Sequence, residues 1–279
     1  MAAKNTVATL TLQRGINPIR LWQWPNVFAL DAALIALFWQ AVFVNSLGLQ
    51  VNLAAHAVLG LSVWLTYMAD RLFDVAKRPL QQLHSVRHRF AKQNVRVLWW
   101  LWACVWLINM GSALAGLTTR ELQNGAVLLI LCLLYTAFNQ ILSRHFFPKE
   151  LCVALIYAGG VIIFLIPAAE LWPPAAALAL LCLINCLMIG AKEQGIDRAL
   201  QVRSMAQLPV PLILALYISS ALLLCCLSHA WLLPIGLSWG ALLIIHIYRR
   251  QLSVESFRVL ADSALLIGPA VTLYIRMQV

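Results

Sequence analysis

The chain has 279 residues, of which 62% are hydrophobic and only 11% are charged, whereas a soluble domain is about half apolar and a quarter charged. The composition therefore excludes an ordinary soluble domain and indicates a polytopic membrane protein. The formal net charge of +10 would suit a nucleic-acid-binding protein, but the distribution of the basic residues along the chain predicts membrane topology instead.

Nine stretches of about 20 apolar residues follow one another, and each has the length that crosses roughly 30 Å of hydrocarbon. We expect transmembrane helices over approximately residues 27–47, 51–69, 95–116, 122–142, 150–169, 173–191, 208–228, 230–248 and 257–275. Residues 1–26 are expected to form a cytoplasmic N-terminal segment, and residues 27–279 a single transmembrane helical domain. The predicted fold class is thus an all-α membrane protein, a bundle of about nine helices around a central cavity.

The basic residues gather in alternate connections between these spans. With the N-terminus in the cytoplasm, the inward segments carry 18 of the 20 Lys and Arg residues, and only Arg120 and Arg276 face outward. This bias is what the positive-inside rule predicts. We therefore expect an integral multi-pass protein of a bacterial inner membrane, with the N-terminus and the long loops in the cytoplasm, in contact with membrane lipids and without a nucleic-acid partner.

Two pairs of acidic residues end the second and the sixth spans. In "TYMADRLFD", Asp70 and Asp74 are four residues apart and share one helix face. Glu193 and Asp197 repeat this spacing in "KEQGID". Because the two spans are four apart, both pairs are expected on the same side of the membrane. Two four-helix repeats followed by a ninth helix would explain the pattern.

Like charges held close together repel, so a sequence that keeps such pairs is expected to place cations between them. Mg²⁺ commonly binds one or two carboxylates together with substrate phosphates and water, and two acidic pairs suit a diphosphate clamped between metal ions. The basic residues beside the acids are suited to phosphate oxygens, and they include Arg71, Lys149, Lys192 and Arg198. The charged head of an apolar diphosphate would then lie at the inner end of the bundle.

In these motifs the chain resembles a divergent member of the UbiA-type intramembrane prenyltransferase superfamily. That family has nine transmembrane helices and Mg²⁺-binding motifs, NxxxDxxxD and DxxxD, after the second and sixth helices. Asp70 and Asp74 match the first motif, with Thr66 in the asparagine position. Asp197 matches the second motif, and Glu193 replaces its first aspartate.

The stretch "FFPKELCVALIYAGG" resembles the lysine-bearing start of the family's fifth helix, which makes Lys149 a candidate diphosphate contact. The resemblance implies a Mg²⁺-dependent enzyme that ionises an isoprenoid diphosphate and transfers the prenyl group to a lipophilic, commonly aromatic, acceptor. It implies metal-binding and catalytic roles for Asp70, Asp74, Glu193 and Asp197, and diphosphate binding by Arg71, Lys149, Lys192 and Arg198.

Other functions stay open. A terpene cyclase of the same type would use the prenyl diphosphate without an acceptor, with aromatic side chains stabilising the cation. A transporter or a lipid-binding membrane protein would keep the acids for structural reasons. Asp31 and Asp262 lie near the inner ends of two spans, and we expect Asp262 to pair with Arg258 or either acid to act as a base. We expect the basic second inner loop to contact anionic lipid. The alternative is that Arg87 and Arg89 in this loop contact the substrate.

Overall fold

The computed structural model describes residues 19–76, 78–83, 85–142, 148–199 and 211–278; within these ranges the side chains of residues 82, 139–142, 194–199 and 211–212 are not described. The described part of the chain is helical and contains no strand. The all-α fold class predicted from the sequence is therefore confirmed.

Nine helices of 14 residues or more form the described bundle, and one falls in each predicted span. They are α3 (Leu30–Leu47), α4 (Leu53–Ala76), α6 (Val95–Gly116), α7 (Thr119–Leu142), α8 (Lys149–Ile162), α9 (Trp172–Ala199), α10 (Pro211–Cys225), α11 (His229–Ile247) and α12 (Val254–Gln278). Seven of them are long and apolar enough to cross a membrane. The chain is thus an integral multi-pass membrane protein, while the internal repeat stays a prediction.

The other two long helices, α8 and α10, have 14 and 15 residues and are shorter than the roughly 17 residues that a membrane-spanning helix needs. The span predicted over 150–169 contains α8, which ends at Ile162, followed by turns and the short helix η3 (Ala169–Leu171). Pro167 disfavours a helical conformation of the residue before it. The sequence remains apolar through this turn, so hydropathy alone extended the predicted span.

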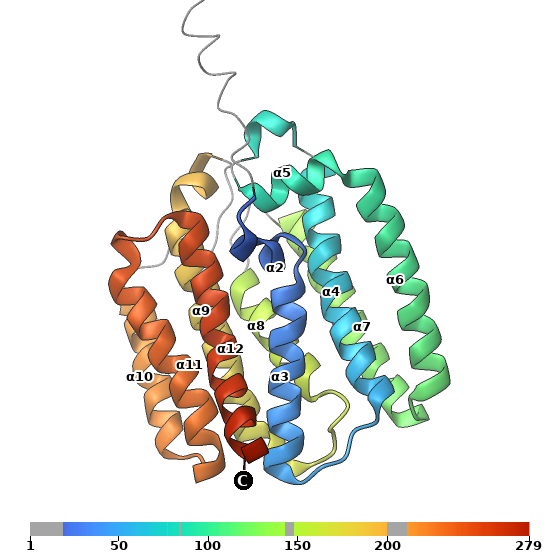
Figure 1. Cartoon of the computed structure of the whole chain (residues 1–279), viewed down its shortest axis with the longest axis vertical. Coiled ribbons are helices and arrows are strands. Elements are labelled where there is room, and N and C mark those ends of the chain that lie inside the picture. Colours follow the sequence, from blue (N-terminus) through green and yellow to red (C-terminus); the bar gives the residue numbers. More distant parts are fainter. Residues whose placement is uncertain (1–18, 77, 84, 143–147, 200–210, 279) are drawn as a thin grey trace, which may run out of the picture.

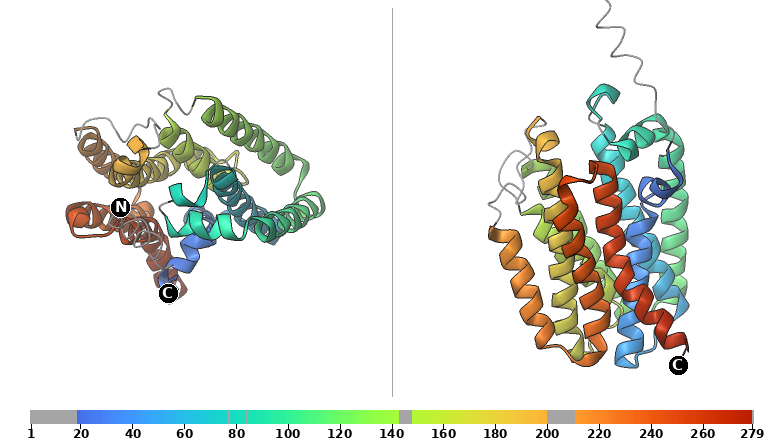
Figure 2. Two further views of the ribbon diagram at one scale, coloured as in Figure 1. Left: turned by 90° about the horizontal axis from the view of Figure 1, so that it is seen from above. Right: turned by 60° about the vertical axis from the view of Figure 1, so that its left-hand side comes forward.

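The helices alternate in direction, so that α4 and α9 end at the same end of the bundle (Figure 1). This end also holds the short helices α2 (Trp24–Val27) and α5 (Val86–Gln93), and we call it the mouth. Seen from above, α5 lies across the ends of the upright helices (Figure 2). The chain end after α12 lies at the opposite end of the bundle (Figure 1), as nine crossings predict.

The helix α9 is the centre of the packing, and α7 lies at the periphery. In the apolar membrane-spanning stretch of α9, 61% of the residues are buried inside the protein, whereas none are buried in the corresponding stretch of α7. The main core joins α3, α8, α9, α11 and α12, and its largest buried side chains include Trp39, Phe43, Leu181, Met188 and Phe257. The exposed leucine, isoleucine and valine side chains of α6 and α7 are the surface that lipid covers in a membrane protein.

Polar side chains fix several of the helix contacts inside this apolar bundle. The indole N–H of Trp39 on α3 donates to the backbone carbonyl of Leu265 on α12 at 2.9 Å. The Tyr157 hydroxyl on α8 donates to the carbonyl of Ala32 at 2.7 Å. Since water is scarce in such a core, each bond satisfies groups that would otherwise cost free energy.

Candidate active site at the mouth of the bundle

The two acidic motifs lie on the last turns of α4 and α9, and both helices end at the mouth (Figure 1). The predicted placement of both motifs on one side of the bundle is therefore confirmed. Both helices continue beyond the apolar runs from which they were predicted, so Asp70, Asp74, Glu193 and Asp197 all lie within helices. The side chains of Asp197 and of the predicted diphosphate contact Arg198 are outside the described residues.

The first acidic pair faces basic side chains from several helices. The Asp70 side chain is exposed, and the charged groups that influence it electrostatically are Asp74, Arg87, Lys149 and Arg71. Lys149 is the first residue of α8 and Arg87 belongs to α5. The predicted cations Arg71 and Lys149 thus lie near the first motif, and Arg87 joins them from the basic loop.

Asp74 lies beside His88 of α5, with 3.7 Å between the carboxylate Oδ2 and the imidazole Nε2. Ser85 caps α5 by accepting a hydrogen bond from the His88 backbone N–H, and its hydroxyl is 2.5 Å from His88 Nδ1. Burial, and then the surrounding guanidinium groups, hold the pKa of His88 well below its usual value; these groups belong to Arg87, Arg71, Arg258 and Arg78. The ring is therefore neutral near pH 7, and its contact with Asp74 is not an ion pair.

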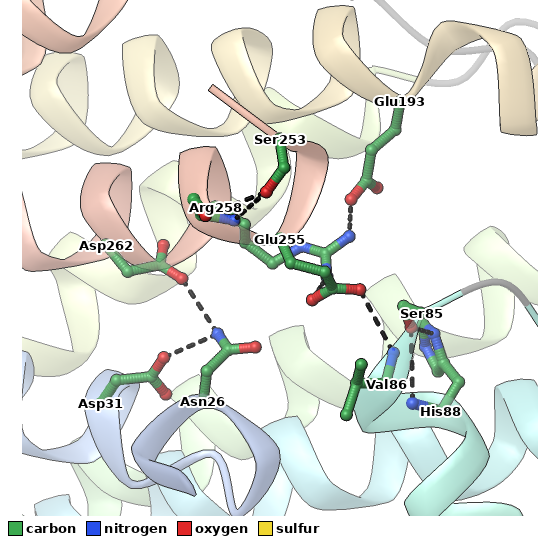
Figure 3. A network of polar contacts seen from close by, with 11 residues as sticks. Asn26, Asp31, Ser85, Val86, His88, Glu193, Ser253, Glu255, Arg258 and Asp262 are labelled. Atoms are coloured by element: carbon green, nitrogen blue, oxygen red, sulfur yellow. Dashed lines mark hydrogen bonds and ion pairs between the residues drawn. The ribbon is translucent and has the colours of Figure 1, made fainter. Parts of the chain in front are cut away.

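The second acidic motif is engaged by a basic side chain of α12. Glu193 forms an ion pair with Arg258, whose side chain is only 3% exposed. Arg258 also contacts the Glu255 carboxylate at 3.4 Å, and Glu255 accepts a hydrogen bond from the Val86 backbone N–H at 3.2 Å. Figure 3 shows this path from Glu193 through Arg258 and Glu255 to the start of α5. The two motifs are thereby connected through α12 and α5.

A second polar group lies beside this path (Figure 3). The side-chain nitrogen of Asn26 donates to Asp31 at 2.7 Å and to Asp262 at 3.2 Å, and Asn185 donates to Asp262 at 3.0 Å. Asn26 and Asn185 are nearly fully buried. Within the described side chains, the ion pairs of Arg258 are those with Glu193 and Glu255, so the expected local pairing of Arg258 with Asp262 is replaced by amide contacts.

The remaining predicted cations make backbone contacts. The buried Arg71 donates to the carbonyl of Val27, which ties α4 to α2. Lys192 donates to the carbonyl of Arg249 at 2.6 Å and lies over the ring of Phe257. The described contacts of Lys192 therefore hold α9 against η5 (Tyr248–Arg250) and the start of α12, and its predicted role in diphosphate binding stays a prediction.

Tyr67, one turn before Asp70, has neighbours on several helices. Its ring packs edge to face on Tyr157 of α8, with 6.3 Å between the centroids, and its electrostatic neighbours lie on α9, α12 and α3. With neighbours on four other helices, Tyr67 nevertheless keeps 36% of its surface accessible. The predicted central cavity stays a prediction.

The residues at the first motif fit a Mg²⁺ ion. Across the described side chains, no group of three or more His, Cys, Asp or Glu residues is arranged to hold a metal. Mg²⁺ needs fewer, because water and substrate phosphates complete its octahedral shell. Asp70 is exposed and Asp74 keeps 40% of its side chain accessible, so both carboxylates can reach a cation. The Glu193 carboxylate is already neutralised by Arg258.

No protein-family model and no curated protein sequence matches the chain. In structure, the chain is similar to a solved apo structure of a UbiA homologue from Aeropyrum pernix K1. The TM-score is 0.67, and the match covers 89% of this chain and 98% of that chain at 16% sequence identity. The helical bundle described above therefore has the UbiA-type fold that the two acidic motifs predicted.

Proposed function

We propose that the protein is a Mg²⁺-dependent prenyltransferase of the UbiA type, which ionises an isoprenoid diphosphate and transfers the prenyl group to a lipophilic, aromatic acceptor. The observation that carries the proposal is the placement of Asp70, one turn before Asp74, near basic groups of α4, α5 and α8 at the mouth of the bundle. The UbiA-type fold of the chain supports it. In the proposal the mouth faces the cytoplasm of a bacterial cell.

In this proposal the two ends of the substrate meet different surroundings. Asp70 and Asp74 hold the metal ion, and Arg71, Arg87 and Lys149 bind the remaining oxygens of the diphosphate through charge-assisted hydrogen bonds. The bound Mg²⁺ supplies electrostatic stabilisation of the charge that develops on the leaving diphosphate. The prenyl chain extends into the bundle, where the faces of Tyr67 and Tyr157 stabilise a cation by about 0.5–2 kcal/mol each.

The neutral state of His88 has a consequence for the first motif. Because its imidazole carries no charge near pH 7, His88 itself does not neutralise the charge of Asp74. A protonated imidazole at 3.7 Å would neutralise that carboxylate instead.

A UbiA-type terpene cyclase is the second candidate function, and the aromatic pair of Tyr67 and Tyr157, one turn from Asp70, favours it. Aromatic faces at that position would stabilise a cation that moves along the prenyl chain during cyclisation. The two functions share the diphosphate site and differ only in whether a second substrate captures the cation.

Both are tested by incubating the purified protein with geranyl, farnesyl and geranylgeranyl diphosphates. We expect pyrophosphate release that depends on Mg²⁺ and is lost on chelation, and a prenylated product only when an aromatic acceptor is added. Release of a cyclic hydrocarbon without acceptor would identify a cyclase. Glu170→Gln, which changes an exposed acid in η3, is the matched control and should keep full activity. Activity that is indifferent to Mg²⁺ would contradict the proposal.

A further inference from the structure

The second acidic motif holds a basic side chain of the protein where the resemblance implies a metal ion. The Arg258 guanidinium is 3% exposed and forms its ion pair with Glu193. Removing one member of a buried ion pair leaves the other charge uncompensated. A metal ion at Glu193 would therefore have to displace a buried guanidinium group, which makes a second metal unfavourable at this position.

The identity of residue 193 agrees with this pairing. Glutamate is one methylene longer than the aspartate of the DxxxD motif. The longer side chain reaches from α9 to Arg258 on α12 (Figure 3). Glu193 is thus the position at which the chain differs from the DxxxD motif, and it is also the residue that pairs with Arg258. A carboxylate that binds a metal ion would not be engaged by such a guanidinium group.

Three guanidinium groups converge at the mouth from three different helices. Arg87 of α5 influences both Arg71 and Arg258 electrostatically, and Arg71 also influences Arg258. We call these three residues the arginine cluster. Like charges at such range repel one another unless anions lie between them. Among the described residues, the Nε atoms of Arg87 and Arg258 are buried and have no hydrogen-bond partner, so these two arginines carry donors that the protein leaves unsatisfied.

The position of Arg87 in this cluster is fixed by α12. Glu255 accepts a hydrogen bond from the backbone N–H of Val86, the residue before Arg87. The same carboxylate contacts Arg258 at 3.4 Å. One acidic side chain therefore contacts Arg258 and the backbone next to Arg87.

We propose that Arg258, together with Arg87, binds the diphosphate from the side of the second motif and takes the place of a second metal ion, which leaves one divalent ion at Asp70 and Asp74. The inference rests on the proposed function and names the partners of its diphosphate. A guanidinium group suits this task because its fixed fork of donors matches phosphate oxygens in a bidentate geometry. Without diphosphate, Glu193 and Glu255 balance the charge of Arg258.

The test uses inorganic pyrophosphate and Mn²⁺, a paramagnetic substitute for Mg²⁺, on the full chain in detergent. Mn²⁺ stoichiometry is measured by electron paramagnetic resonance and pyrophosphate affinity by calorimetry. The wild type should bind one Mn²⁺ per chain with pyrophosphate, and Asp70→Asn should abolish that binding. Glu193→Gln should leave the stoichiometry at one.

Arg258→Gln should weaken pyrophosphate binding about tenfold or more, which is the loss of one charge-assisted hydrogen-bonding group. Because this variant leaves Glu193 unpaired, the double variant Arg258→Gln with Glu193→Gln removes both charges, and it should show the same loss while keeping the thermal unfolding midpoint. Arg258→Lys should restore part of the affinity. Arg250→Gln, at an exposed position of η5 (Tyr248–Arg250), controls for general electrostatics and should bind normally.

The two proposals fail differently. Two Mn²⁺ ions per chain, with one lost in Glu193→Gln, would overturn the role of Arg258 and leave the proposed function standing. Unchanged pyrophosphate affinity in the double variant would do the same. A wild type that binds neither Mn²⁺ nor pyrophosphate, or an Asp70→Asn variant that binds both normally, would overturn the proposed function as well.

Discussion

Glu255 on α12 accepts a hydrogen bond from the backbone N–H of Val86, 169 residues earlier in the chain, at 3.2 Å. Val86 is the first residue of α5, the short helix that carries Arg87 and His88 toward the acidic residues. A side chain of the last helix thus sets where the basic loop lies over the mouth. This carboxylate adds to the packing of α5 on α2, through Phe90 and Trp24, and to the hydrogen bond from Lys92 to the Val75 carbonyl of α4.

Glu255→Ala should loosen α5. A hydrogen bond to a charged acceptor is worth about 1.5–3 kcal/mol, so we expect the amides of residues 86–93 to exchange about tenfold faster or more. Hydrogen–deuterium exchange in detergent measures this. Glu121→Ala removes a carboxylate that holds the Thr118 backbone N–H in the same way, and it should leave α5 unchanged. Equal exchange of α5 in both variants would contradict the role of Glu255.

The neutral His88 should make the protein sensitive to acid. Burial and the neighbouring guanidinium groups lower the pKa of His88 from 6.5, so below that pH the unfolded ring takes up a proton that the folded ring refuses. The stability that the neutral ring contributes is thus present above the unfolded pKa and is lost as the pH falls toward the folded value. Between about pH 7 and about pH 5, the wild type should lose more thermal stability than His88→Gln. Equal losses of thermal stability in the wild type and in His88→Gln would contradict the neutral state of the His88 ring.

The amide of Asn26 separates two carboxylates, so Asn26→Ala should destabilise the bundle. Its loss leaves Asp31 and Asp262 facing each other without their shared donor. The expected cost is about 2 kcal/mol, the range for a removed partner of buried charged groups. Asn45→Ala is the matched control, because Asn45 is exposed and donates only to Ala41 of its own helix. Thermal unfolding in detergent should separate the two variants, and equal midpoints would be evidence against the bridge.

The contact between α11 and α12 depends on Gly268. A Cβ atom at this position would collide with the Pro234 carbonyl and the Ser238 side chain. We therefore expect Gly268→Ala to cost about 1–3 kcal/mol, as overpacking does. Gly240 of α11 has no atom within 4 Å of such a Cβ, so Gly240→Ala should be neutral or stabilising by up to about 1 kcal/mol. A Gly268→Ala variant as stable as Gly240→Ala would refute this packing argument.

The sequence predicts what depends on local spacing. Apolar runs locate the nine helices, and the four-residue spacing of Asp70 and Asp74 places them on one face of α4. The alternation of spans is sufficient to bring both acidic motifs to one end of the bundle. The resemblance of "FFPKELCVALIYAGG" to the family's fifth helix marks Lys149, which directly precedes the fifth predicted span and lies near Asp70.

The partners that complete the site are distant in sequence and follow no periodic pattern. Arg258 is four residues from Asp262, which made a local pair the natural expectation, yet it pairs with Glu193 of another helix. Asn26 reaches Asp262 across 236 residues. Amide side chains carry no charge, so the sequence offers no signal that Asn26 and Asn185 neighbour acids. Only the packing of α2, α9 and α12 decides these contacts.

The central claim is that the mouth is a diphosphate site organised by Asp70, and pyrophosphate release from farnesyl diphosphate tests it most directly. We expect purified wild-type protein to release pyrophosphate when Mg²⁺ is present. The Asp70→Asn variant should release it at least about 100-fold more slowly, which is the scale on which removal of a stabilising group slows such chemistry. Equal rates for the wild type and a folded Asp70→Asn variant would contradict the account.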